Sequence, residues 1–240
     1  MPELRVEFDE RLTEVRTDLI RVAALVEEAV QAGTRALLDA DLDLVDRVIE
    51  ADAVIDRLCG SIEERTYELI ALQQPMAGDL RTLLAVLRIL QELELTGDLM
   101  VSVAKNARRL YPFDLPPRIR GLLERMGEQA GVQLHAAVDA FVDGNHTLAA
   151  ALPDMDDVMD TLQTQLYRVI FSTGAADERA LHQAVTTALL GRFYERVGDH
   201  AVQIARWADF VISGRLPRTV GQDRDREPAA SGDATGGGDG

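Results

Sequence analysis

The chain has 240 residues, a formal net charge of −16 and 47% apolar residues, which suits a globular protein that buries a sizeable core. The acidic excess argues against nucleic acid and anionic lipid as direct partners, because both are negatively charged. No basic–apolar leader and no apolar run of about 18–20 residues occurs, so we expect neither a secretory signal nor a membrane span. The single cysteine, Cys59, cannot form an internal disulfide, which favours a cytoplasmic location.

Apolar residues recur at helical spacing in six successive segments. The first carries a stripe from Leu12 to Leu37 at steps of three, four or seven residues. The next five span about 41–72, 77–110, 117–142, 146–173 and 177–213, with proline, glycine, asparagine and aspartate between them. No segment alternates with the period of two that is typical of a half-buried strand. The pattern predicts an all-α protein.

The two halves of the chain repeat each other. An offset of 104 residues aligns Asp52–Asp56 with Asp156–Asp160, and an offset of 101 aligns Glu94–Asp98 with Glu195–Asp199. We therefore predict two tandem three-helix bundles related by an internal pseudo-twofold axis, with repeat one in residues 1–111 and repeat two in residues 112–215. Residues 216–240 carry no apolar stripe, and we expect a disordered tail there.

Four acidic pairs with a spacing of four residues lie on the second and third helices of each half. Two carboxylates at this spacing share a helix face and repel each other by roughly 0.2–0.5 kcal/mol per pair, so something is expected to neutralise them. Clustered carboxylate oxygens are ligands for hard cations such as Mg, Ca, Mn or iron. The candidate metal ligands are Asp52, Asp56, Glu94, Asp98, Asp156, Asp160, Glu195 and Asp199.

Each E-x-x-G-D segment has a glycine inside a predicted helix, Gly97 in the first half and Gly198 in the second. Such a glycine costs about 1 kcal/mol relative to alanine, so it indicates the close approach of a neighbouring helix or a ligand. A basic residue, Lys105 or Arg206, follows each motif aspartate by seven positions. Direct neutralisation by these bases is the alternative to a metal, and a helical scaffold with incidental clusters is another.

The acidic pairs, the Glu-Arg-Val-Gly-Asp form at Glu195–Asp199 and the segment Gln-Pro-Met-Ala-Gly-Asp-Leu-Arg at 74–81 resemble the PhoU family of phosphate-signalling regulators. The resemblance extends over residues 5–213. It implies a cytoplasmic, non-enzymatic protein that forms homodimers or larger assemblies. It also implies that the acidic pairs bind metal clusters, with iron or zinc as the first candidates and Mg or Mn as others.

The same resemblance implies a role in phosphate homeostasis. The protein would be a negative regulator of the starvation response that couples the ATPase of the high-affinity phosphate ABC transporter to the sensor kinase PhoR. It would modulate phosphate uptake and reach the inner face of the membrane through these partners.

This sequence departs from the family pattern at Leu95, where arginine is usual, whereas Arg196 keeps the arginine in the second half. The Q-P-x-A-x-D-L-R segment also occurs in the first half alone, so partner contacts through that loop are expected to be asymmetric. Two other functions stay open, an accessory protein of a low-affinity, cation-coupled phosphate transporter and a carboxylate-bridged di-metal enzyme. The Glu-x-x-His spacing of helical di-iron oxidases is absent.

Overall fold

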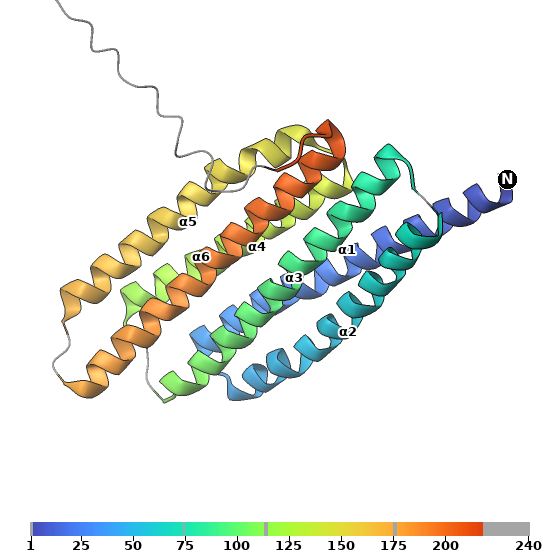
Figure 1. Ribbon diagram of the computed structural model, residues 1–240. Helices are drawn as coiled ribbons and strands as arrows, with labels where there is room; N and C mark the ends of the chain where they lie inside the picture. The colour runs from blue at the N-terminus through green and yellow to red at the C-terminus, as the bar shows by residue number, and fades with distance from the viewer. Residues whose placement is uncertain (1, 74, 113–114, 175–176, 218–240) are drawn as a thin grey trace, which may run out of the picture.

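A computed structural model describes residues 2–73, 75–112, 115–174 and 177–217, which form six helices and no strand (Figure 1). The helices are α1 (Pro2–Asp39), α2 (Leu42–Gln73), α3 (Ala77–Leu110), α4 (Pro117–Val142), α5 (His146–Thr173) and α6 (Glu178–Ser213). The predicted all-α fold is confirmed, and the last five helices match their predicted ranges to within a residue. Helix α1 begins well before its apolar stripe. Residues 218–240, most of the predicted disordered tail, lie outside the described residues, as does Gln74.

Polar caps and left-handed residues set the helix ends. At the start of α5 the side-chain oxygen of Asn145 accepts a hydrogen bond from a backbone N–H three residues on, at 3.1 Å. Asp177 caps α6 in the same way at 2.8 Å. Helix α6 ends at Gly214, whose φ of 72° lies in the left-handed region that favours glycine. These local signals place the turns where the chain reverses direction.

The six helices form two three-helix bundles, α1–α3 and α4–α6, packed side by side (Figure 1). Between the bundles, α3 packs along α6 and α1 packs against α4. Among the described residues, no other pair of helices from different bundles packs this closely. A twofold axis that exchanges the bundles maps each of these two pairs onto itself, so the contacts have the predicted pseudo-twofold pattern.

One apolar core runs continuously through both bundles. Where α1 meets α4, a Cβ added to Gly127 would lie 2.5 Å from side-chain atoms of Thr34, so only glycine fits there without a shift. The Thr34 hydroxyl lies 2.9 Å from the hydroxyl of Tyr194, a fully buried residue of α6. The first bundle is therefore joined to the second by close packing and by a buried hydrogen bond.

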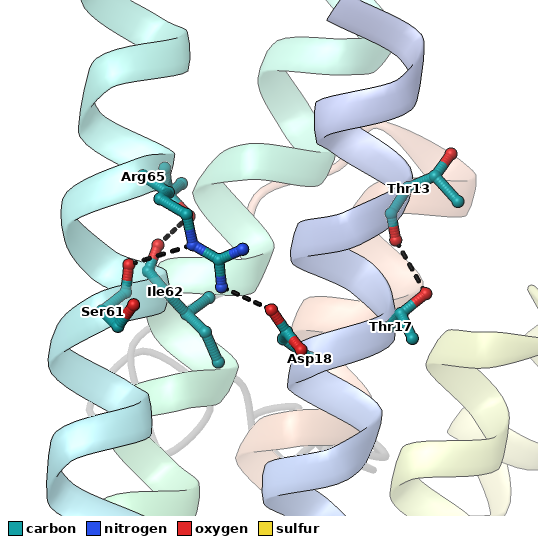
Figure 2. Close-up of polar contacts among 7 residues, drawn as sticks. Thr13, Thr17, Asp18, Ser61, Ile62 and Arg65 are labelled. Carbon is teal, nitrogen blue, oxygen red and sulfur yellow. Dashed lines mark hydrogen bonds and ion pairs between the residues drawn. The ribbon is translucent and has the colours of Figure 1, made fainter.

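The seam between α1 and α2 is closed by an ion pair. Arg65 of α2 donates to Asp18 of α1 at 2.5 Å and to the carbonyl of Ser61 at 3.3 Å (Figure 2). The Arg65 and Asp18 side chains are 35% and 31% exposed, so the pair contributes about 0–1 kcal/mol. The seam between α2 and α3 differs, because it gathers charges of one sign.

Candidate metal centre

The first cluster (Asp52, Asp56, Glu94 and Asp98) lies along the seam between α2 and α3. Asp52 is half-buried, and burial, followed by the charges of Asp56 and Asp98, raises its pKa to about 6. The pKa of Glu94 is raised by burial first and then by the same two carboxylates. These mutual effects across the seam show that the structure brings the four predicted residues together.

The second cluster (Asp156, Asp160, Glu195 and Asp199) occupies the equivalent seam between α5 and α6. Burial is the main cause that raises the pKa values of Asp156, Glu195 and Asp199, and the other carboxylates of the cluster add to it. Both groups of four therefore form clusters of mutually repelling acids, each with a half-buried aspartate, at equivalent places in the two bundles.

The motif glycines provide the close approach that the sequence predicts. A Cβ added to Gly97 would lie 3.0 Å from Asp52 Oδ1, and one added to Gly198 would lie 2.5 Å from Asp156 Oδ1. In each bundle the half-buried aspartate of one helix thus lies against the bare backbone of the next. The glycine makes room for a carboxylate on the seam.

Direct neutralisation by Lys105 and Arg206 is not what the structure shows. In the described part of the chain, neither residue forms an ion pair within 4.0 Å with a cluster carboxylate. Lys105 acts on the first cluster at longer range, where its charge lowers the pKa of Asp52 and so opposes the effect of burial. The repulsion within the first cluster is therefore only partly offset.

The two clusters differ in their own counter-charges. In the second, Arg192 forms an ion pair with Glu195, and the charges of Arg192, His200 and Arg196 lower the pKa of Asp199 against the effect of burial. The repeat offset of 101 residues places Gln91 and Leu95 where the second bundle has Arg192 and Arg196. The first cluster consequently lacks both arginines.

Two residues of the second cluster's surroundings were missed by the sequence reasoning. Gln133 of α4 is fully buried and donates from Nε2 to Asp156 Oδ1 at 3.0 Å. Its amide on the apolar face of an amphipathic helix was the available signal. Arg192 was detectable from its spacing of three residues before Glu195.

His200, which the sequence reasoning set aside as a ligand, links the bundles. Its side chain is buried, and its Nδ1 lies 2.7 Å from Glu92 Oε2 of α3. The contact spans the α3–α6 interface next to Asp199. His200 is thus engaged by the other bundle.

The donor chemistry of both clusters fits a hard cation, although the carboxylates do not already converge. Among the described residues, no three His, Cys, Asp or Glu side chains are close enough to hold one ion. One oxygen of Glu195 is nevertheless buried without a hydrogen-bond partner in the described part of the protein. Asp52 and Asp156 are half-buried, and the exposed carboxylates around them are Asp56, Glu94, Asp98, Asp160 and Asp199.

None of the described helices combines the length and the apolar character that crossing a membrane requires.

The similarity of this chain to known proteins also covers its two halves separately. The family model described as "PhoU domain" matches residues 19–107 and again residues 123–208. The phosphate-specific transport system accessory protein PhoU homolog 1 of Mycobacterium tuberculosis is 35% identical over 89% of this chain and 96% of its own length. Homolog 2 of the same organism is 34% identical over 89% of this chain and 100% of its own.

Solved structures resemble the fold as well. The crystal structure of PhoU from Pseudomonas aeruginosa superposes with a TM-score of 0.82 at 30% identity, covering 87% of this chain and 100% of that one. The phosphate transport system regulatory protein PhoU from Streptococcus pneumoniae, at 23% identity and a TM-score of 0.81, shares the fold.

Proposed function

The chain belongs to the PhoU family, and from this premise we propose that it is an accessory protein of a phosphate-specific transport system that represses the phosphate-starvation response. The observation that carries the proposal is the extent of the similarity, which spans both bundles.

In the proposed mechanism the chain binds two partners in the cytoplasm, the ATPase of a phosphate ABC transporter and the sensor kinase PhoR. It catalyses no reaction, and acts by holding the kinase in its phosphatase-like state while phosphate is plentiful. A homodimer or larger assembly would present these docking surfaces more than once. The acidic surface of the chain favours basic patches on the partners.

The two clusters give this adaptor its proposed cation dependence. A bound cation, with iron or zinc as first candidates and Mg or Mn as others, would supply the positive charge that the carboxylates lack. Asp52 and Asp156 would anchor it from the half-buried side of each seam, and the exposed carboxylates would close over it. The spacing of α2 from α3, and of α5 from α6, would then depend on whether the clusters are occupied.

The decisive experiment is an affinity pull-down of the tagged protein from cells grown in high phosphate, with mass spectrometry of the bound proteins. Recovery of the transporter ATPase together with a sensor kinase supports the proposal. The pull-down is repeated with two double variants. Asp52→Asn/Asp156→Asn removes one charge from each cluster, and the control Glu10→Gln/Glu14→Gln removes two charges from α1.

Recovery of a cation-coupled phosphate carrier alone would reject the ABC-transporter assignment in favour of a low-affinity system. Metal-dependent turnover of a phosphoester or of oxygen, abolished by Asp98→Ala, would reject the non-enzymatic role. A strain that lacks the protein and any second copy, yet still silences its phosphatase genes in rich phosphate, would reject repression.

A further inference from the structure

The second carboxylate cluster has a neighbour that the first lacks, the side chain of Gln133 on α4. Gln133 is fully buried, and its Nε2 donates a hydrogen bond to Asp156 Oδ1 at 3.0 Å. The repeat offset of 104 residues places Ala29 at the equivalent position of α1, and alanine brings no amide. Polar groups from three helices, α4, α5 and α6, therefore meet at the second cluster.

The amide of Gln133 lies inside the seam between α5 and α6. A Cβ added to Gly198 of α6 would lie 3.2 Å from Gln133 Oε1, 3.4 Å from Gln133 Nε2 and 2.5 Å from Asp156 Oδ1. The bare backbone at Gly198 thus makes room for an amide as well as a carboxylate. Because Gly198 directly precedes Asp199, the amide reaches α6 next to a residue of the cluster.

Two buried oxygens at this cluster have no hydrogen-bond donor. In the part of the chain that the structure describes, the buried side-chain oxygens without a partner are Gln133 Oε1 and Glu195 Oε2. Arg192 pairs with the other oxygen of Glu195, so its charge does not satisfy Oε2. A buried acceptor without a partner is costly and needs an explanation. A cation that takes oxygen ligands provides one, because side-chain amide oxygens join carboxylates around hard cations.

We propose that Gln133 is a ligand of the cation at the second cluster through Oε1, and that its Nε2 holds the neighbouring ligand Asp156 in place. The inference rests on the proposed cation binding and adds to it a neutral residue from outside the acidic motifs. It also makes the two clusters different sites. The first, with Ala29 in place of Gln133, has carboxylates and water alone to offer a cation.

The affinity of the second cluster for Mn²⁺ tests the role of the amide. Mn²⁺ titration is followed by electron paramagnetic resonance in chains that carry Asp52→Asn and Asp98→Asn, so that the second cluster alone reports. Gln133→Met removes the amide and keeps the length of the side chain. It should weaken Mn²⁺ binding about tenfold or more, since one ligand and the hydrogen bond to another are lost.

Gln129 provides a matched control on the same helix. Its Nε2 donates to the backbone carbonyl of Met155 at 2.8 Å, whereas that of Gln133 donates to a cluster carboxylate. Gln129→Met should therefore leave the Mn²⁺ affinity within about twofold of the parent chain. Equal weakening by the two variants overturns the proposal. Gln133→Asn, which keeps an amide but shortens its reach, is a second loss variant with the same expectation as Gln133→Met.

The hydration of the bound Mn²⁺ separates a ligand from a residue that only supports the fold. Water fills the position that Oε1 leaves, so water-proton relaxation should report an additional coordinated water in Gln133→Met. Gln133→Glu keeps an oxygen at this place and should restore both the affinity and the hydration of the parent chain. Unchanged hydration in Gln133→Met, or no recovery in Gln133→Glu, overturns Oε1 as a ligand.

The same titrations distinguish the failure of this inference from the failure of the cation function. Absence of Mn²⁺ binding in every chain, including the natural one with both clusters intact, overturns the cation function and this inference with it. Mn²⁺ binding at the second cluster that does not respond to Gln133→Met overturns the inference alone.

Discussion

The substitution Asp52→Asn tests the electrostatic account of the clusters, because it removes one charge and keeps the shape of the side chain. In the folded protein the pKa of Asp52 is raised from an ordinary value of 3.8 to about 6, by burial first and by Asp56 and Asp98 next. The unfolded chain lacks these causes. The charged form of Asp52 therefore lowers the stability of the folded state.

The pH at which this cost appears follows from the two pKa values. Below about pH 3 Asp52 is protonated in both states, and the cost is absent. As the pH rises from about 4 to 6, the unfolded state releases its proton first, so the free energy of unfolding decreases. Above pH 6 the full cost applies. The difference between pKa values of 3.8 and about 6 corresponds to about 3 kcal/mol, and solvent screening of a half-buried group reduces this to roughly 1.5 kcal/mol.

In chelator at pH 7.5, Asp52→Asn should thus raise the free energy of unfolding by about 1.5 kcal/mol and the melting temperature by about 3–6 °C. At pH 3 natural chain and variant should melt alike. Thermal unfolding followed by circular dichroism measures both conditions. The control is Glu50→Gln on the exposed face of α2, which removes the same charge without relieving the cluster. A variant that gains nothing over the natural chain between pH 3 and pH 7.5 would refute the reasoning.

Three further outcomes are expected. Gly127→Ala should lower the free energy of unfolding by about 2 kcal/mol, because the added methyl group overpacks against Thr34. Gly131→Ala lies on the same helix but has no atom within 4 Å of the added methyl group, so it should raise the free energy of unfolding by up to about 1 kcal/mol. Urea unfolding of both variants separates the effect of packing from that of helix propensity. Tyr194→Phe should cost about 1 kcal/mol in the same assay, since it removes a buried hydrogen bond, and an unchanged midpoint would count against that bond. Asp56→Ala with Asp98→Ala should lower the melting temperature in metal-replete buffer and not in chelator, so identical melting of this variant and the natural chain under both conditions would contradict a structural cation.

Local patterns in the sequence predicted most of the helix boundaries. Asn145 and Asp177 are strong caps at the start of α5 and α6. The apolar stripe of α5 continues past Pro153, and the helix is unbroken there. The early start of α1 was missed because the stripe was read only from Leu12 on. Leu4 and Phe8 precede Leu12 at the same spacing of four residues, and Phe8 is buried in the core.

The alignment of the two halves was sufficient to predict that the eight carboxylates form two clusters, because it places the acidic pairs of each half on two helices that pack together. The contacts from outside the motifs could not be found that way. Gln133 reaches Asp156 from α4, and His200 reaches Glu92 in the other bundle. Such contacts depend on how helices are rotated against each other, which a single apolar stripe leaves undetermined.

The contacts between the bundles join two helices to their own repeat equivalents, α1 to α4 and α3 to α6, as the interface of an isologous dimer does. Within one chain this pairing does not depend on protein concentration. It also removes a constraint, because in a true homodimer every substitution appears twice. Here Gln91 and Leu95 have diverged from Arg192 and Arg196 without altering the other side. Duplication and fusion have thus given an almost symmetric scaffold the freedom to tune its two acidic seams independently.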